Sequence, residues 1–526
     1  MMATNKGYHS TEVAEDIEMH RPGFEPVPLN KSKYSYEEAL DLAGTGKYNT
    51  LLLLSCFLVV AAMGVDIFGL GIIVTAATCD LRMDLQQIST LSSMPFAGII
   101  LMSYPWGYLS DTRGRKLVLM WAMAGSFVSS SLSSLAPNWQ TLAVLRFVSS
   151  ALSSAAESAT YALLGECCTG RVRAKYMLLM TSALMLTPTL YYIWAYFITK
   201  LDFSFQFIGV DYRPWRLLTL VMALPLGLGA ATLYFFEESP KFLANVGRNE
   251  EAVTAIKRIY VVNGGREEDY PIEEIFLEDG SEAAGRFSLR SLWTQIAPLF
   301  QPPLLYRTLL LYYLTFVIYI ANNSFAIILP TIFNVFFTSY ATSGAGAGFC
   351  DLFAMSGNST SNDTDSDLSP GAAPECSGRI NDNTIWAGCA HGLSFFLLNA
   401  LISQCAGKRK ILSVTILVVA AGAALAVARS GEAVSGLLLF YVYLTTAMVF
   451  GVVSSYFVDL YPTSYRGMVA CLGMMVARLS AFAGTNLVGG AITHHCSAAL
   501  HAAAAVVISG AIAALFLPSD SNIQPG

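Results

Sequence analysis

The chain has 526 residues, of which 54% are hydrophobic and 13% are charged, whereas a typical soluble domain is roughly a quarter charged. This composition excludes an ordinary soluble globular protein and indicates a polytopic membrane protein whose helices are surrounded by lipid. The formal net charge of -6 excludes the basic field of a nucleic-acid-binding protein, so no nucleic-acid partner is expected.

The sequence offers no pattern for enzyme chemistry. Its ten cysteines are scattered through apolar segments and loops, and no short-spaced cluster of metal ligands is visible. No arrangement of a nucleophile with a neighbouring base is visible either. We therefore expect no catalytic residue, no metal and no cofactor. Residues 1–50 are polar and lack an apolar core segment, so no cleavable signal peptide is expected.

The first 49 residues mix charged residues and prolines with few apolar ones, which predicts a cytosolic N-terminal tail, disordered up to about Ser35. Twelve later segments have about 20 predominantly apolar residues, the length that crosses a bilayer. In the first half they are 50–77, 91–109, 117–136, 142–165, 176–198 and 215–236. In the second half they are 304–333, 384–405, 411–427, 436–458, 467–492 and 500–517.

The distribution of Lys and Arg predicts the orientation of these segments. With the N-terminus in the cytosol, Lys and Arg are more frequent in the loops that face the cytosol than in the opposite loops, as in most membrane proteins. We predict an all-α membrane protein with twelve transmembrane helices in two six-helix bundles, 50–239 and 304–518. Both termini, including a short tail at 519–526, are expected in the cytosol.

Two long segments interrupt the apolar pattern. The inner one, 240–303, has helical patterning at 250–260 and 271–277, and we predict a cytosolic helical linker, with a disordered linker as the alternative. The outer one, 340–382, contains the sequons Asn358-Ser-Thr and Asn362-Asp-Thr, which predict glycosylation. Cys350 and Cys376 flank these sequons in an oxidising compartment, and we predict a disulfide between them.

A charged elbow, Gly107-Tyr-Leu-Ser-Asp-Thr-Arg-Gly-Arg-Lys116, joins the second and third apolar segments. We expect Gly107 to let two helices approach closely and Gly114 to allow a sharp turn. Asp111 would pair with Arg115 or accept from the amides of the following helix. The alternative is a positively charged loop that only sets the topology.

The elbow pattern G-x-L-x-D-x-x-G-R-K resembles the loop between spans two and three of the major facilitator superfamily. Tyr161-Ala-Leu-Leu-Gly-Glu166 with Arg171-Val-Arg173 resembles the end of span four in sugar-porter-like members, and Asp459-Leu-Tyr-Pro-Thr-Ser-Tyr-Arg466 resembles the matching point of the second half. Glu237-Glu-Ser-Pro-Lys-Phe-Leu243 resembles the motif after span six. The resemblance implies a cytosolic gate formed by Gly107, Asp111, Gly114, Arg115, Lys116, Glu166, Arg173, Asp459 and Arg466.

A narrower resemblance is carried by the first span. Gly64-Val-Asp-Ile-Phe68, followed by Cys79-Asp-Leu81, is similar to the synaptic vesicle glycoprotein 2 group, and the glycosylatable loop between spans seven and eight is typical of that group. The resemblance covers nearly the whole chain, but Gln404 stands where the second elbow would carry an acid, which puts that elbow's salt bridges in doubt. It implies a transporter in a plasma or vesicle membrane, with the solute site between the two halves.

Charged residues inside apolar spans indicate function. Asp66 and Arg146 lie at depths that agree to roughly 6 Å at 1.5 Å per residue, so an ion pair is feasible. The resemblance to proton-coupled sugar porters implies that Asp66 binds a coupling proton and that Arg146 sets its pKa; a pair that only fixes helix register is the alternative. Glu157 is a candidate for binding a cation, for facing a water-filled vestibule or for pairing with Arg478. Arg478 would hold an anionic group or neutralise Glu157.

Aromatic and amide side chains complete the candidate solute site. Tyr191 and Tyr192 lie in span five, and Asn322 and Asn323 lie in the middle of span seven. Rings with a few amides suit a neutral sugar or an organic cation, although the tyrosines are also candidates for anchoring at the lipid interface. We expect alternating-access transport of a small organic solute, with proton coupling left open. The alternative is a transport-inactive vesicle or surface glycoprotein that recruits partners.

Overall fold

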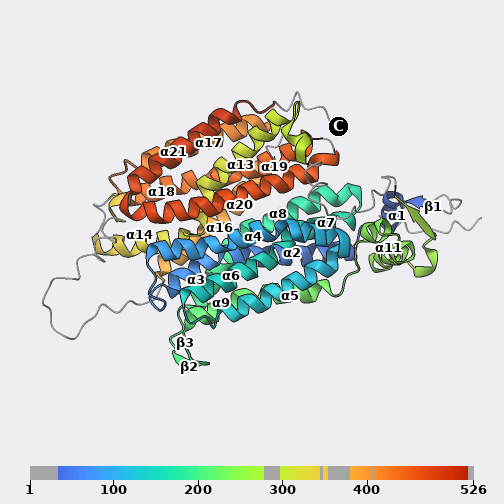
Figure 1. Cartoon of the computed structure of the whole chain (residues 1–526), viewed down its shortest axis with the longest axis horizontal. Helices are drawn as coiled ribbons and strands as arrows, with labels where there is room; N and C mark the ends of the chain where they lie inside the picture. Colours follow the sequence, from blue (N-terminus) through green and yellow to red (C-terminus); the bar gives the residue numbers. More distant parts are fainter. Residues whose placement is uncertain are drawn as a thin grey trace, which may run out of the picture.

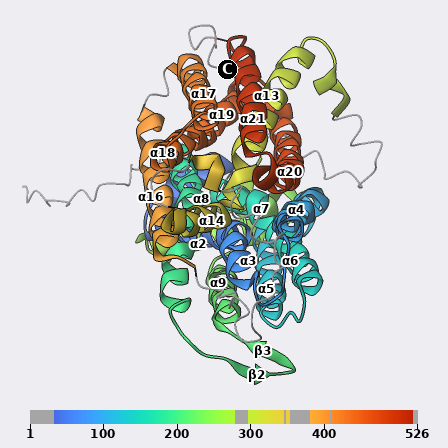
Figure 2. The ribbon, with the colours of Figure 1, turned by 90° about the vertical axis from the view of Figure 1, so that its left-hand side faces the viewer.

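The computed structural model describes residues 33–277, 296–343, 348–352, 380–404, 408–461 and 463–518. Long helices lie side by side along the longest axis of the molecule, and the N-terminal half of the chain occupies one side and the C-terminal half the other (Figure 1). The view along the bundle separates the same two halves (Figure 2). This arrangement confirms the mostly helical membrane fold.

In each half the chain runs along the length of the bundle six times within the described residues. The N-terminal helices are α2 (Lys47–Phe68) continued by α3 (Leu70–Ala77), α4 (Leu85–Arg113), α5 (Arg115–Ser133), α6 (Trp139–Ser153) continued by α7 (Ala155–Glu166), α8 (Gly170–Ile198) and α9 (Pro214–Leu233). The C-terminal helices are α13 (Leu305–Ala326) continued by α14 (Leu329–Ser343), α16 (Asp382–Gln404), α17 (Arg409–Val427), α18 (Ala433–Leu444) and α19 (Met448–Asp459) joined by η4 (Thr445–Ala447), α20 (Thr463–His494) and α21 (Cys496–Ala514).

Hydropathy divides these passes into two groups. Over the described residues, six are long and apolar enough to cross a membrane by composition alone, and they contain α2 with α3, α9, α13, α17, α18 with α19, and α21. The other passes carry more polar residues. Two pairs of these more polar helices, α4 with α20 and α8 with α16, pack against each other and join the two halves. These two contacts between the halves are therefore made by helices that are less suited to lipid.

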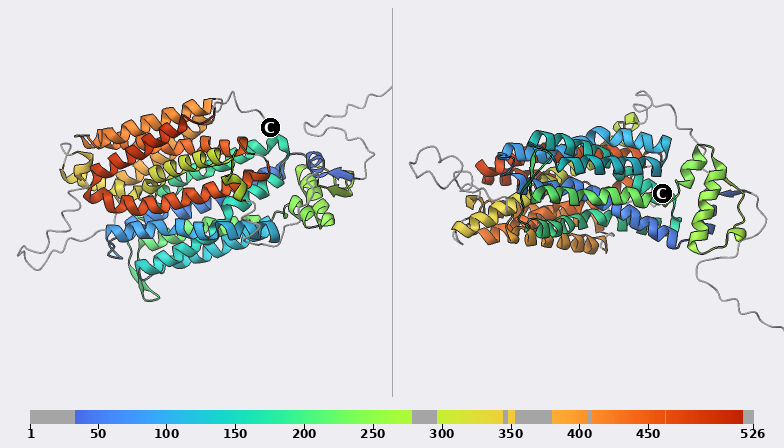
Figure 3. Two further views of the ribbon diagram at one scale, coloured as in Figure 1. Left: turned by 45° about the horizontal axis from the view of Figure 1, so that its top comes forward. Right: turned by 90° about the horizontal axis from the view of Figure 1, so that it is seen from below.

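A cap of short elements covers one end of the bundle (Figure 3). It contains the helices α1 (Tyr36–Ala43), α10 (Pro240–Asn245) and α11 (Asn249–Asn263), with the 3-10 turn η1 (Glu267–Asp269); η2 (Ala297–Phe300) leads into the second half. Strands β1 (Lys33–Ser35) and β4 (Glu274–Phe276) pair in parallel. The helix expected at 250–260 is confirmed, but the one expected at 271–277 is wrong, because Ile275 is buried between two exposed neighbours, the alternation of a strand.

The end of the N-terminal tail is docked on this cap. Ser35 and Glu38 form a capping box at the start of α1. The backbone N–H of Tyr48 donates to Asn263 Oδ1 at 3.0 Å, and Asn49 Nδ2 donates to the carbonyl oxygen of Cys167 at 2.8 Å. Residues 33–49 therefore tie the cap to the N-terminal half.

The two ends of the bundle are different. The first described residues and the end of α21 with its following turn lie at the end that carries the cap, which we call the cap end (Figure 1). The opposite end carries a short hairpin of β2 (Phe205–Phe207) and β3 (Val210–Tyr212), and we call it the loop end. An even number of passes places both ends of the described chain at the cap end.

The expected disulfide between Cys350 and Cys376 is wrong, because Cys350 is bonded to Cys496, with the two Cα atoms 5.6 Å apart. Cys350 follows Phe349, which is fully buried and stacks on Phe440 at 5.5 Å. This packing holds Cys350 against the bundle, beside the start of α21. Cys376, Asn358 and Asn362 lie outside the described residues.

We predict that Cys496→Ser releases the thiol of Cys350 for alkylation by a maleimide and lowers the free energy of unfolding by about 2–5 kcal/mol. Peptide mapping by mass spectrometry measures the first effect and thermal unfolding the second. Cys389→Ser removes a free cysteine and is the matched control, which should change neither. A peptide linking Cys350 to Cys376 in the native protein would contradict the assignment.

Candidate functional site

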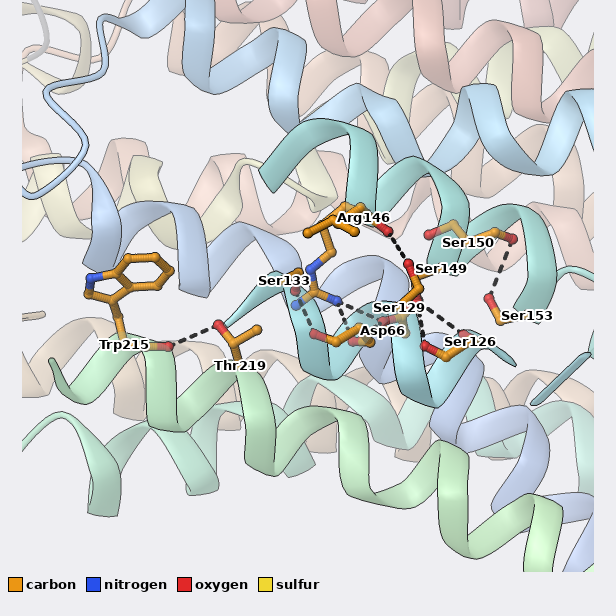
Figure 4. Close-up of polar contacts among 12 residues, drawn as sticks. Asp66, Ser126, Ser129, Ser133, Arg146, Ser149, Ser150, Ser153, Trp215 and Thr219 are labelled. Atoms are coloured by element: carbon orange, nitrogen blue, oxygen red, sulfur yellow. Dashed lines mark hydrogen bonds and ion pairs between the residues drawn. The ribbon is translucent and has the colours of Figure 1, made fainter. Parts of the chain in front are cut away.

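An ion pair is buried inside the N-terminal half. Asp66 of α2 and Arg146 of α6 are joined by a contact of 2.7 Å between Oδ1 and Nη1, and both side chains are completely inaccessible. The hydroxyls of Ser130 and Ser149 donate to Oδ1 and Oδ2 of Asp66, each at 2.9 Å (Figure 4). The predicted pairing of Asp66 with Arg146 is therefore present, and Ser149 satisfies the second carboxylate oxygen, Oδ2.

These serines belong to a polar stripe that sequence reasoning missed. Its members on α5 and α6 are Ser126, Ser129, Ser130, Ser133, Ser149, Ser150 and Ser153 (Figure 4). The hydroxyls of Ser126 and Ser149 lie 3.0 Å apart across the two helices. On α5 the spacing is i, i+3, i+4 and i+7, which marks one helix face, so the signal was present in the sequence. Small hydroxylated residues also allow close helix contact in a membrane.

The Asp66–Arg146 pair leaves part of the guanidinium without a partner. Nε and Nη2 of Arg146 are buried and make no hydrogen bond within the described part of the chain. A charge so far from water is stable only while its counter-charge stays in place. The pair thus makes the interior of the N-terminal half sensitive to the charge of Asp66.

A second ion pair crosses between the halves. Arg478 Nη2 of α20 lies 2.5 Å from Glu157 Oε1 of α7. The Arg478 side chain is 6% exposed and that of Glu157 21%, and the guanidinium carbon lies 6.0 Å from the ring centre of Tyr319 on α13. Of the options open for Glu157, the structure realises pairing with Arg478. This contact links the two halves near the middle of α20.

The amides and the tyrosines occupy different surroundings. Asn322, which is 9% exposed, lies one turn after Tyr319 on α13 and donates to Asn323 Oδ1 at 3.0 Å. Tyr191 and Tyr192 are buried towards the loop end, and the ring of Tyr192 packs so closely on α16 that a Cβ on Gly388 would lie 2.1 Å from it. Tyr192 therefore fills part of the contact between α8 and α16, with Tyr191 beside it, and this contact is separate from the Glu157–Arg478 pair.

The halves are closed against each other at the loop end. A Cβ on Gly71 of α3 would lie 1.9 Å from the carbonyl oxygen of Ile327, just before α14. The hydroxyls of Thr75 and Thr331 lie 2.8 Å apart across the same contact. On the other flank, Lys200 pairs with Asp382 at 3.2 Å. Access to the Glu157–Arg478 pair from the loop end is therefore narrow.

The charged elbow makes a group of ion pairs and hydrogen bonds at the cap end. We call this group, which includes Asp111, Arg115, Glu166 and Glu238, the latch. Arg115 contacts Asp111 Oδ1 at 3.0 Å, Glu166 Oε2 at 3.1 Å and the carbonyl oxygen of Ser110 at 3.0 Å. Ser239 Oγ donates to the same Glu166 carboxylate. Burial raises the pKa of Glu166 above its usual range, and the positive charge of Arg115 opposes that rise.

Glu238 completes the latch, and sequence reasoning did not assign it a role. Its carboxylate accepts from the backbone N–H of Lys116 at 2.8 Å and from that of Leu117 at 3.2 Å, which are free amides at the start of α5. The quoted motif Glu237–Leu243 contained this residue, but its partner lies far away in the sequence.

The latch residues contact the N-terminal half and the cap rather than the C-terminal half. Within the described residues, Arg173 pairs with Glu37 of α1 at 2.9 Å, and Lys116 Nζ donates to the carbonyl oxygen of Tyr234 at 3.3 Å. Asp459 and Arg466 belong to α19 and α20, but their side chains lie outside the described set. The described contacts of the elbow thus lie within the N-terminal half and the cap, and the cytosolic gate stays a prediction.

The two glycines of the elbow differ. Gly114 has a φ of +112°, and a Cβ there would lie 2.4 Å from Glu238 Oε2, so the expected sharp turn is confirmed. Among the described atoms, none lies within 4 Å of a Cβ built on Gly107, so the expected close helix approach at Gly107 is not seen in this part of the chain. That approach occurs earlier on α4, where a Cβ on Gly98 would lie 2.4 Å from the carbonyl oxygen of Phe147.

Comparisons with known proteins agree with this architecture. A family model described as Major Facilitator Superfamily matches residues 54–360. The synaptic vesicle 2-related protein of Bos taurus is 26% identical over 327 residues, 60% of this chain and 54% of the relative. Synaptic vesicle glycoprotein 2B of Homo sapiens is 25% identical over 237 residues, 44% of this chain and 34% of the relative. The match thus spans about half or less of these relatives.

Solved structures show the same fold. The xylose transporter XylE from E. coli, in a partially occluded inward open conformation, superposes with a TM-score of 0.60 at 14% identity, over 90% of this chain and 100% of that one. A D-xylose-proton symporter superposes with a TM-score of 0.59 at 15% identity, over 90% and 99% of the two chains. At this identity the likeness concerns the fold alone.

We predict that Arg146→Met or Asp66→Leu alone lowers the free energy of unfolding by roughly 3–5 kcal/mol, because each leaves one buried charge unpaired. The double variant should recover most of this loss, since apolar residues of similar volume replace both charges. Thermal unfolding in detergent measures the cycle. The exposed Arg429 provides the control Arg429→Met, which should be nearly neutral. Additive losses in the double variant would contradict the pairing.

The latch glycines give a matched comparison. Gly114→Ala should lower the free energy of unfolding by at least about 1 kcal/mol, because alanine resists a positive φ and would meet Glu238. Gly107→Ala should be neutral or stabilise the helix by up to about 1 kcal/mol. Thermal unfolding measures the free energy of unfolding of the two variants. An equal decrease in both would show that the elbow is packed differently.

Proposed function

Because the chain belongs to the major facilitator superfamily, we propose that it is a secondary active transporter that moves a small organic solute, a sugar or an organic ion, by alternating access. The main observation that supports this proposal is the Glu157–Arg478 ion pair. It joins the two halves deep in the bundle, at the depth where such folds place their solute site. A structural protein would gain little from a charged pair that spans a movable contact.

The pair gives a route from solute binding to movement. When the halves rock, Glu157 and Arg478 must separate, and each would then be a poorly solvated charge. A solute with a cationic group can replace Arg478 beside Glu157, and an anionic group can replace Glu157 beside Arg478. Asn322 and Asn323 add hydrogen-bonding groups from α13. The bound solute thus lowers the barrier to separation by supplying the lost partner.

Tyr191 and Tyr192 then belong to the closure of the loop end, since Tyr192 packs against α16 and the ring of Tyr191 lies 4.8 Å from that of Tyr192. Their burial supports a role in sealing the pathway on this side, in place of direct solute binding. Opening at the loop end would separate them from α16 and expose them to the pathway.

Proton coupling through Asp66 is the second part of the proposal. The carboxylate is inaccessible and is held by Arg146 and two serines, so protonation would remove the counter-charge of a buried guanidinium. The fold likeness to a D-xylose-proton symporter supports this reading. Asp66 and Arg146 lie in the N-terminal half, whose helices α4, α7 and α8 face the C-terminal half. Protonation of Asp66 would therefore alter the packing on which the rocking of the halves depends.

The orientation follows from charge. The elbow bases Arg113, Arg115 and Lys116 lie at the cap end, which the positive-inside preference assigns to the cytosol. Both termini are then cytosolic, and the sequons Asn358 and Asn362 face the other compartment, where glycans are attached. The membrane is proposed to be a plasma or vesicle membrane.

The experiment is a solute-panel uptake assay in reconstituted liposomes, with and without an inward proton gradient. We expect the gradient to stimulate uptake of one solute class. Asp66→Asn should abolish this stimulation while solute exchange without a gradient continues. The exposed Glu432 supplies the control Glu432→Gln, which should transport like the native protein. Uptake of no solute under any gradient would contradict the proposal and favour a glycoprotein that recruits partners.

The inter-half pair is tested by reversing its charges. Glu157→Arg or Arg478→Glu alone places two like charges in contact, and uptake should fall by about tenfold or more, the factor that about 1.4 kcal/mol produces. The double reversal restores opposite charges and should recover part of the uptake. A double variant that is no better than either single one would show that the contact has no role in transport.

A further inference from the structure

The β2–β3 hairpin stands apart from the bundle. Its strands pair in antiparallel, with Phe205 opposite Tyr212 and Phe207 opposite Val210. Ile208 and Gly209 make the turn with φ values of +49° and +76°, the pattern that fits the twist of a two-residue hairpin. The hairpin projects sideways from the loop end, beyond α9, in both views of the bundle (Figures 1 and 2).

The hairpin is amphipathic. Paired residues of a hairpin point to the same face, and successive residues alternate, so Phe205, Phe207, Val210 and Tyr212 share one face, and Gln206 shares the other with its partner Asp211. The rings of Phe205 and Tyr212 stack at 5.4 Å, and Phe207 lies edge-on to Tyr212 at 6.1 Å. The rings thus form one continuous aromatic surface.

This surface is poorly covered by protein. Phe205 is 51% exposed and Phe207 is 46% exposed, and Ile208 at the tip of the turn is 75% exposed. Three large apolar side chains at the tip of a hairpin are unfavourable in water. Aromatic residues at the ends of membrane spans are instead typical of the interface between lipid and water.

A groove of about 570 Å³ separates the aromatic face from the bundle. Phe205 and Phe207 form one wall, and Val128, Leu132 and Leu220 belong to the opposite one on α5 and α9. The groove lies at the last turns of α5, which ends at Ser133, and therefore at the level where the hydrocarbon of a bilayer meets its headgroups.

The groove opens onto lipid. On α5 the residues Leu117, Trp121, Val128 and Leu132 are 44%, 67%, 55% and 49% exposed, and their spacing of four, seven and four residues places them on one helix face. On a membrane-spanning helix such an exposed apolar stripe faces the hydrocarbon. Val128 and Leu132 belong both to this stripe and to the groove, so the groove continues the lipid-facing surface and is separate from the contact between the halves.

We propose that the β2–β3 hairpin is an interfacial anchor that holds one acyl chain of a bilayer phospholipid against α5 and α9. The apolar walls recognise hydrocarbon, and the rings of the hairpin cover the chain from the side of the headgroups. Gln206 and Asp211 on the opposite face remain in contact with water. This site is independent of the proposed transport, because none of its walls belongs to the contact between the halves.

The test is photocrosslinking of the full chain in phosphatidylcholine vesicles that contain a clickable acyl-chain probe. Phe207→p-benzoylphenylalanine places the reactive ketone on the aromatic face, and Gln206→p-benzoylphenylalanine places it on the polar face of the same strand. We expect on the order of tenfold more lipid adduct from position 207, because burial of one aromatic side chain in hydrocarbon gives that preference or more. Mass spectrometry of the adduct identifies the attached lipid.

A second variant makes the result independent of the crosslinker. Phe205→Ser with Phe207→Ser should leave the transmembrane helices intact and reduce the phospholipid retained in native mass spectrometry by about tenfold. Equal adduct from positions 206 and 207, or no lipid adduct from either, would overturn the proposal. A clickable sterol added to the same vesicles tests the occupant: sterol adduct without phospholipid adduct at position 207 would overturn the acyl-chain assignment.

Discussion

The structure depends on one constraint: a charge inside a bilayer needs an opposite charge beside it. Two arginines meet this requirement in different ways. Arg146 finds Asp66 within its own half, in a site closed to solvent. Arg478 finds Glu157 in the other half, across a contact that the proposed alternating access would break. The first pair belongs to the packing of a rigid bundle, and the second belongs to the contact between two bundles.

The distribution of polarity over the helices follows from the same constraint. Two helix pairs that join the halves, α4 with α20 and α8 with α16, are outside the set that is apolar enough to cross a membrane by composition alone. Serines on α5 and α6 carry hydrogen bonds to Asp66 within the N-terminal half. Polar side chains are therefore concentrated where protein surrounds them, inside the N-terminal half and along these helix contacts.

Much of this arrangement could be predicted from the sequence, because length, hydropathy and the elbow motif are local properties. The pairing of Asp66 with Arg146 was predictable from their similar depth. The partner of Cys350 was not, since Cys496 is 146 residues away and a nearer cysteine was available. The role of Glu238 was missed for a similar reason, since its partners Lys116 and Leu117 lie far away in the sequence.

The central claim is that Glu157 and Arg478 stabilise the state in which the loop end is closed. Cysteines at Thr75 and Thr331, whose hydroxyls lie 2.8 Å apart across that closure, report the closed population through their rate of oxidative crosslinking in membranes. Glu157→Gln in this background should lower the ratio of closed to open states by about tenfold, as expected for the loss of roughly 1.4 kcal/mol, and the crosslinking rate should fall with it. An unchanged rate would contradict the claim.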